Sequence, residues 1–171
     1  MYYYLFNKDM KCIAMQEQVT FDAVEEGYTV YESDSIYRRL DSVVYEDGKV
    51  KTTVPLEEFK LNRIKNHIKH ARDTRELRPI VYNGHKWDVD KDSIMRIQIA
   101  INALGDNGTI TWTDANNNNV ENVTANDLQN ILKALAERSN RMHIKYRLLR
   151  EKVMSCKSHE EVASITWNTE L

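Results

Sequence analysis

Residues 79–93 of the chain, PIVYNGHKWDVDKDS, contain several residue types that could do chemistry. Aspartates stand at alternate positions from Asp88 to Asp92, as they do at the start of an EF-hand loop that surrounds Ca²⁺ with oxygen atoms. That loop also needs glycine at its sixth position and a bidentate glutamate at its twelfth. The chain has Ser93 and Ile99 there, and isoleucine cannot bind a metal. We therefore expect an aspartate of this run to cap a helix that starts near Ser93.

Two further pairs have helical spacing. His67 and His70 could share one helix face, but a zinc site needs more ligands, and the surrounding basic residues favour a solvated face. Ser139 and His143 could form a nucleophile and its base, yet no third partner is identifiable, so packing is the better interpretation. The sequence contains no GxSxG, P-loop, GxGxxG or HExxH motif. We predict a protein that is not an enzyme and needs no cofactor or metal.

The segment from Lys60 to Arg78 is strongly basic. A basic helix can follow the phosphates of a nucleic acid, so a nucleic-acid-binding adaptor that uses residues 60–78 is the alternative function. Asp73 and Glu76 offset part of this charge, and no aromatic residue is interleaved to stack on bases. The net charge of the chain is -2, which does not favour bulk binding to nucleic acid or to an anionic membrane.

Aromatic residues are concentrated in the N-terminal part. Six of them are candidates for binding a partner protein: Tyr2, Tyr4, Phe6, Tyr28, Tyr31 and Tyr45. In one interpretation, alternate aromatics fill the core of a small sheet. In the other, an aromatic face stays exposed because such a sheet has few helices to cover both sides, and that face marks a binding surface.

The composition describes an ordinary globular chain. With 171 residues, of which 42% are hydrophobic and 29% charged, it suits one domain or one domain with a small appendage. Cys12 and Cys156 form no CxxC motif, which indicates a reduced, cytosolic setting rather than a disulfide. No stretch approaches ~18 consecutive apolar residues, so we expect no membrane partner.

These candidate residues are positioned by elements that predict an α+β fold. Residues 1–54 read as a small antiparallel β unit whose clearest hairpin turns at Asp47-Gly48, and residues 55–171 as a helical domain. The helical domain contains a short β insertion: Asn83-Gly84 predicts a hairpin turn, and "GTITWTD" alternates as a strand does. We expect Tyr82 and Trp87 to anchor the first of these hairpins on the helices.

Apolar periodicity predicts several helices. A helix from Pro55 to Arg78 has a narrow seam of Leu61, Ile64, Ile68 and Ala71, and another spans residues 93–104. The strongest pattern follows Thr124–Asp127, which resembles a capping box. Its heptad positions, interrupted by Ser139, are Leu128, Leu132, Leu135, Met142, Tyr146, Leu149 and Val153. This seam either packs within the chain, which we favour, or joins copies in a homo-oligomer.

The order of these features resembles a known family. The matching stretches are "RDTRELRPIVYNGHKWDVDKDSIMRIQIAINAL", "ITWTDANNNNV", "VTANDLQNILKALAERSNRMHIKYRLLREKV" and "SHEEVASITW". They are similar to a C-terminal domain of unknown function that is typical of bacteriophage tail-fibre assembly and tail-fibre-associated proteins. The N-terminal β unit resembles the opening of many of these proteins more loosely. The extra asparagines of "DANNNNV" depart from the family pattern and change only a loop.

The resemblance implies a non-enzymatic phage tail protein. It would assist the assembly of the tail fibre or stay attached to it, as a chaperone or a structural adaptor. Its expected partner is a tail-fibre or baseplate protein, and its expected location is the host cytoplasm during assembly or the tail of the virion. The resemblance implies no catalytic residue.

Overall fold

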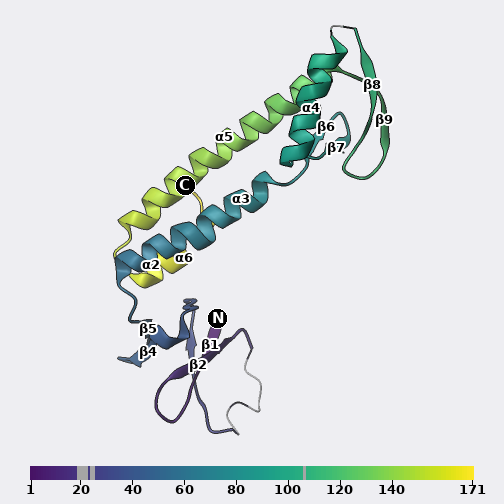
Figure 1. The fold of residues 1–171 in the computed structure, drawn as a ribbon. Helices are drawn as coiled ribbons and strands as arrows, with labels where there is room; N and C mark the ends of the chain where they lie inside the picture. Colours follow the sequence, from purple (N-terminus) through teal and green to yellow (C-terminus); the bar gives the residue numbers. More distant parts are fainter. Residues whose placement is uncertain (19–22, 24–25, 106) are drawn as a thin grey trace. The chain divides into compact units, whose positions relative to one another are not determined.

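The computed structural model describes residues 1–18, 23, 26–105 and 107–171. It has a mixed α+β fold with an N-terminal antiparallel sheet, helices and small two-stranded sheets, which confirms the predicted fold class (Figure 1). The chain forms two compact units: the first comprises residues 1–68 and 149–170, and the second residues 69–148 with Leu171. These units do not follow the domain boundary predicted between residues 54 and 55, which stays a prediction.

The N-terminal sheet of the first unit is antiparallel. It consists of β1 (Tyr2–Phe6) between β2 (Cys12–Gln16) and β3 (Thr29–Ser33). A separate hairpin of β4 (Val43–Glu46) and β5 (Lys49–Thr52) follows a short 3₁₀ turn, η1 (Leu40–Ser42). The turn of this hairpin is Asp47-Gly48, as predicted, and both residues have positive φ, 51° and 76°.

The core of this β region is aromatic. Tyr4, Phe6 and Tyr37 are buried there together with Val43 and Val50. The Tyr4 hydroxyl donates to the Ser35 carbonyl oxygen and accepts from the Tyr37 amide, both at 2.7 Å. Burial raises the pKa of Tyr4 to about 12. Tyr4 is therefore a neutral structural link between β1 and the segment after β3.

The basic segment is helical, but its middle turn is wider than an α-helix. It comprises α2 (Leu56–Arg63), a π-helical segment η2 (Ile64–Lys69) and α3 (His70–Glu76). The predicted apolar seam is wrong at Leu61, whose side chain is 61% exposed, whereas Ile64 and Ile68 are buried. A π turn has more residues than an α turn and shifts the phase of the helix, so a pattern with regular spacing cannot anticipate which residues face inward.

The last helix, α6 (His159–Ser164), belongs to the first unit. Its N-terminus is capped by the Ser158 hydroxyl, which accepts from the Glu161 amide at 3.1 Å, as in the Ser-x-x-Glu pattern of a capping box. Val162 on this helix is fully buried, and His159 packs edge-on against Phe59 of α2. Helix α6 thereby covers α2 although the two are far apart in the sequence.

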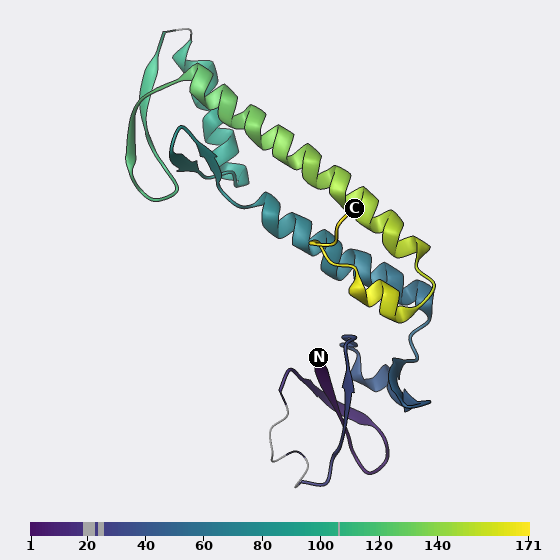
Figure 2. The same ribbon diagram turned by 180° about the vertical axis from the view of Figure 1, so that it is seen from behind.

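The second unit combines two β-hairpins with helices. Its elements are α3, β6 (Ile80–Tyr82), β7 (His85–Trp87), α4 (Lys91–Leu104), β8 (Thr109–Thr113), β9 (Asn119–Thr124) and α5 (Ala125–Ser155) up to Leu148. Figures 1 and 2 show α4 beside the beginning of α5 from opposite sides. Its buried core consists of Trp87, Ile97, Ala100, Val123, Leu128 and Ile131.

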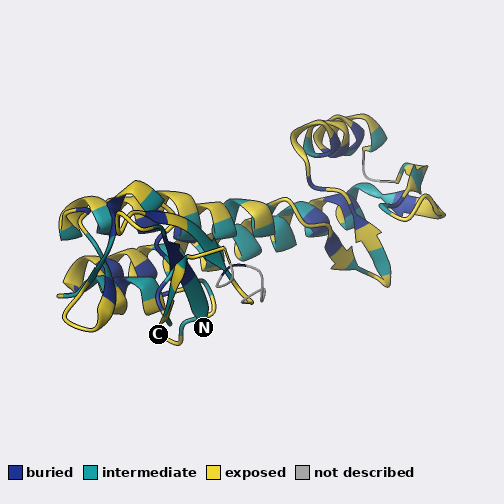
Figure 3. Ribbon diagram, turned by 90° about the horizontal axis from the view of Figure 1, so that it is seen from below, coloured by how far each residue is buried: buried dark blue, intermediate teal, exposed yellow. Residues whose placement is uncertain are grey.

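Helix α5 starts with the predicted capping box. The Asp127 amide donates to the Thr124 hydroxyl at 3.1 Å, and the Asp127 carboxylate accepts from the Thr124 amide at 3.0 Å. On the heptad seam, Leu128, Leu149 and Val153 are fully buried, and the remaining positions are half-buried. Figure 3 shows buried and exposed positions alternating along the helices. Within the part of the chain that the structure describes, no helix combines the length and the apolar character that crossing a bilayer requires.

Candidate functional site

The stretch PIVYNGHKWDVDKDS is a hairpin followed by a helix start. Asn83 and Gly84 form its turn with φ of 48° and 78°, as the Asn-Gly pair predicted. Trp87 is buried, its ring centroid lies 6.3 Å from that of Trp112, and its indole N–H donates to the Tyr82 carbonyl at 3.1 Å. This hairpin is therefore anchored in the core of the second unit, where we expected it to be.

The aspartates of this stretch do not converge on a common point. The Asp90 carboxylate caps α4, accepting from the amides of Asp92 and Ser93 at 3.0 Å. The Ser93 hydroxyl, which also donates to this carboxylate, lowers the pKa of Asp90 most, and the amides lower it further. Asp88 and Asp92 are exposed. Over the described residues, no group of three or more acidic, histidine or cysteine side chains could hold a metal ion. The predicted cap is confirmed.

A buried aspartate holds the neighbouring hairpin. Asp114, which is 4% exposed, accepts from the amides of Asn116 and Asn118 at 2.8 and 2.9 Å and so closes the turn between β8 and β9. These amides, that of Asn118 most of all, lower its pKa. His85 Nδ1 lies 3.3 Å from the Asp114 carboxylate, and the Ala115 amide donates to the Lys86 carbonyl. The asparagine run therefore forms a turn, and the contacts of Asp114 and Ala115 connect this turn to β7.

Ser139 and His143 do have a third partner, which the sequence did not reveal. The Ser139 hydroxyl donates to Glu76 Oε1 at 2.9 Å, and His143 Nε2 lies 3.3 Å from the same oxygen. In a catalytic triad the histidine lies between the nucleophile and the carboxylate. Here the Glu76 carboxylate lies between the other two side chains. The Ser139 hydroxyl therefore donates its hydrogen bond to Glu76 and not to His143. The three side chains join α3 to α5.

The basic residues of α2 and α3 are partly used inside the fold. Lys60 is 5% exposed and pairs with Glu57 at 2.8 Å, while Arg63 is 9% exposed. Arg72 lies over the ring of Tyr146, with its guanidinium carbon 4.8 Å from the ring centroid, and pairs with Asp73. The basic face expected for nucleic-acid binding is therefore smaller than the sequence suggested, because long basic side chains can bury their stems and still bond their charged ends.

The aromatic candidates occupy two environments. Tyr4 and Phe6 are fully buried, so they fill the core and do not line a surface. Tyr2, Tyr28, Tyr31 and Tyr45 are half-buried. Tyr31 and Tyr45 stack with ring centroids 3.5 Å apart and bridge the sheet to the β4–β5 hairpin. A role of the half-buried tyrosines in binding a partner stays a prediction.

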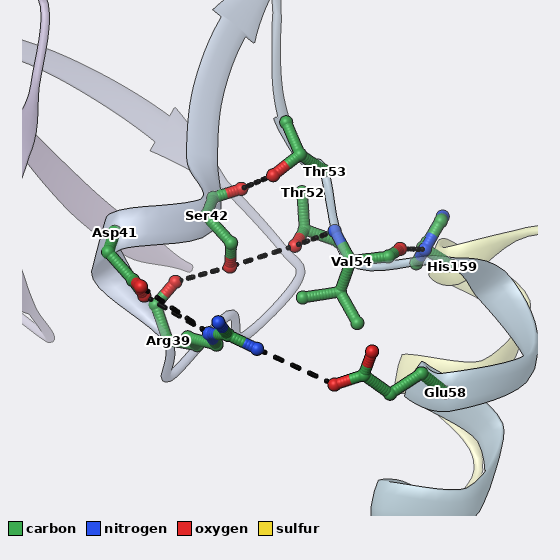
Figure 4. A network of polar contacts seen from close by, with 8 residues as sticks. All are labelled: Arg39, Asp41, Ser42, Thr52, Thr53, Val54, Glu58 and His159. Atoms are coloured by element: carbon green, nitrogen blue, oxygen red, sulfur yellow. Dashed lines mark hydrogen bonds and ion pairs between the residues drawn. The ribbon is translucent and has the colours of Figure 1, made fainter.

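The first unit contains a cavity of about 260 Å³ that we call the basic cavity. Its lining includes Tyr37, Arg38, Arg39, Phe59, Arg63 and His67. One wall consists of η1 and β5, where the Ser42 and Thr52 hydroxyls lie 3.3 Å apart and Thr53 bonds the Ser42 carbonyl (Figure 4). His159 of α6 bonds the Val54 carbonyl at 2.7 Å. The sequence does not reveal this site, because its lining comes from separate segments that share no motif.

A family model matches residues 60–166, and its description is "Domain of unknown function (DUF4376)". The chain belongs to this family. No curated protein and no solved structure matches the chain. The matched region includes η2, the anchored hairpin, α5 and α6, whereas most of the N-terminal β region lies outside it. The family description names no function, so the tail-fibre resemblance stays a prediction.

Proposed function

We propose that this DUF4376 protein is a non-enzymatic phage tail protein that assists assembly of the tail fibre or stays attached to it. The observation that carries the proposal is the resemblance of residues 72–104, 110–120, 123–153 and 158–167 to tail-fibre assembly and tail-fibre-associated proteins. The partner under this proposal is a tail-fibre or baseplate protein, and the place of action is the host cytoplasm during assembly or the virion tail.

The roles of the resembling residues support a structural function. Asn83-Gly84 makes a turn, Trp87 fills a core, Asp90 caps α4, and Thr124 with Asp127 caps α5. Each of these residues stabilises the fold, and none of them requires a substrate to account for its position. Turn, cap and core residues of this kind fix the backbone, and a binding or assembly domain needs a fixed backbone to present its surface to a partner.

The β elements supply surfaces that suit a fibre protein. Val81 of β6 and Ile110 of β8 are large apolar side chains that are 68% and 38% exposed. The β6–β7 and β8–β9 pairs are each two-stranded sheets, and a strand at the edge of a sheet presents N–H and C=O groups that can pair with another chain. Half-buried Tyr2 and Tyr28 lie in the N-terminal β region. Such surfaces favour contact with a β-rich partner.

The proposal is tested by affinity purification from cells that produce the phage. The tagged protein should recover a tail-fibre or baseplate protein in a stable complex. Replacing Tyr2, a predicted partner-binding residue, by serine should reduce this recovery. The matched control is Tyr3→Ser, because Tyr3 is also half-buried on β1 but is not one of the predicted partner-binding residues. Tyr2 packs against the aromatic core, so circular dichroism first establishes that both variants are folded.

Two outcomes give different answers. If repeated purifications recover no tail protein, the proposed function is wrong. If Tyr2→Ser and Tyr3→Ser reduce recovery equally, Tyr2 does not belong to the binding surface, although the protein still binds a tail protein. Assaying purified virions for the protein then distinguishes an adaptor that stays attached from a chaperone that leaves.

A further inference from the structure

The basic cavity is lined by basic, neutral polar and apolar side chains, and none of the described residues that line it is acidic. Arg38, Arg39, Arg63 and His67 supply its basic groups, and η2 contributes to its wall. π-helical turns are uncommon and occur frequently at functional sites. The cavity lies within the first unit, so its lining belongs to a single compact body.

Arg63 is held rigidly at this cavity by backbone carbonyls. Its Nε and Nη2 donate to the Ile165 carbonyl at 2.9 and 2.6 Å, and Nη2 also donates to the Ala163 carbonyl at 2.8 Å. These acceptors come from α6 and the residue after it. They orient the guanidinium without neutralising it, because a carbonyl oxygen carries no net charge. Nη1 makes no hydrogen bond to a residue that the structure describes.

Two of the arginines at this cavity, Arg38 and Arg63, have no ion-pair partner among the described residues. Burial, and to a lesser extent the charge of Arg38, lowers the pKa of Arg63. Arg39 differs, because it lies 3.3 Å from Asp41 and 3.5 Å from Glu58 (Figure 4). A buried guanidinium without a counter-charge is costly, and a bound anion would remove that cost.

The rest of the lining favours a carboxylate on an apolar stem. Ile36, Val54 and Phe59 line the cavity beside the arginines. Methylene groups pack favourably on such surfaces, and a guanidinium fork matches the two oxygens of a carboxylate. A volume of about 260 Å³ leaves room for an acidic side chain. We infer that the basic cavity binds an acidic side chain of a partner polypeptide, with Arg38 and Arg63 as its ligands.

This inference stands on the cavity and does not depend on a tail fibre being the partner. Its test uses the full-length protein and a fluorescein-labelled peptide of glutamates, followed by fluorescence anisotropy at low ionic strength, with a glutamine peptide of equal length as the uncharged control. The natural protein should bind the glutamate peptide and not the glutamine peptide. Arg38→Gln should weaken binding about tenfold or more, the effect of losing a charged hydrogen bond.

Lys65→Gln is the matched control. Lys65 is an exposed cation that follows Arg63 in the continuous helix of α2 and η2, and it does not line the cavity. It should bind the glutamate peptide as the natural protein does. Equal weakening by Arg38→Gln and Lys65→Gln would show a general electrostatic attraction and overturn the inference. Absence of glutamate-peptide binding to the natural protein would overturn it as well.

A local readout excludes a false positive from another surface. In protein labelled with ¹⁵N-arginine, the Arg63 Nε signal should shift when the glutamate peptide is added and stay in place with the glutamine peptide. Inorganic phosphate at the same concentration of charge should shift it much less. If phosphate shifts the Arg63 Nε signal as much as the glutamate peptide does, the ligand is not specifically a carboxylate. If the peptide binds and the Arg63 Nε signal does not change, the peptide does not bind in the basic cavity.

Discussion

Thr124 and Asp127 show how two side chains define the start of the longest helix. The Thr124 hydroxyl accepts a hydrogen bond from the Asp127 amide, and the Asp127 carboxylate accepts one from the Thr124 amide. The Thr124 hydroxyl also donates to the Asp127 carboxylate at 2.6 Å. This reciprocal arrangement satisfies donors that the first turn of a helix leaves without partners. The residues lie only three positions apart, so the arrangement was predictable from the sequence.

We expect Thr124→Ala to lower the free energy of unfolding by about 1 kcal/mol, the usual cost of losing a hydroxyl cap. Thr124→Ser keeps the hydroxyl and should stay close to the natural protein. Chemical denaturation followed by circular dichroism measures both. An alanine variant as stable as the serine variant would show that the cap contributes nothing.

Asp127 also makes stability depend on pH. The Thr124 hydroxyl and amide hold the pKa of Asp127 below its ordinary value. A carboxyl with a lower pKa in the folded state stabilises the fold above its unfolded pKa of about 3.9, and this contribution disappears as pH falls through the folded value. Asp127→Asn should therefore be destabilised at pH 7 and indistinguishable from the natural protein in strong acid. An equal difference at both pH values, in denaturant titrations, would contradict this.

At the scale of elements, Arg138 joins α5 to the end of α3. Its Nη1 donates to the Arg78 carbonyl at 2.6 Å and its Nη2 to the Glu76 carbonyl at 2.7 Å. Carbonyls at the end of a helix have no partner within that helix, so this guanidinium satisfies them from outside. The neighbouring contact of Ser139 with Glu76 reinforces the same junction.

Arg138→Lys should lower the free energy of unfolding by about 1–2 kcal/mol, because an ammonium group cannot reach both carbonyls with the geometry of a fork. Arg141→Lys is the matched control: Arg141 is exposed on the same helix, and its change should stay within about 0.5 kcal/mol. If both variants lower the free energy of unfolding equally in urea titrations, the two hydrogen bonds of the Arg138 guanidinium do not stabilise the junction between α3 and α5.

For the whole molecule, the heptad seam of α5 raises the question of self-association. Leu128 lies in the core of the second unit, and Leu149 and Val153 are buried in the first. The two ends of the seam are thus covered within the chain, and the half-buried positions between them are covered in part, so less apolar surface is left for another copy.

We therefore expect light scattering to give the mass of one chain, 20.1 kDa, over a range of concentrations. A mass of twice this value that persists on dilution would show that the seam, or another surface, joins copies. Leu148→Ala then identifies the surface, because Leu148 is 44% exposed and lies beside the buried Leu149. A dimer that Leu148→Ala dissociates would place the interface on the outer face of α5.

The sequence by itself determined the α+β class, the turns at Asp47-Gly48 and Asn83-Gly84, and the caps of α4, α5 and α6. These features depend on residues a few positions apart, so local backbone preferences decide them. Only the tertiary structure decided that Arg63 bonds the Ile165 carbonyl and that Glu76 lies between Ser139 and His143. Such pairs are 63 to 102 positions apart, and packing, which local periodicity does not encode, brings them together.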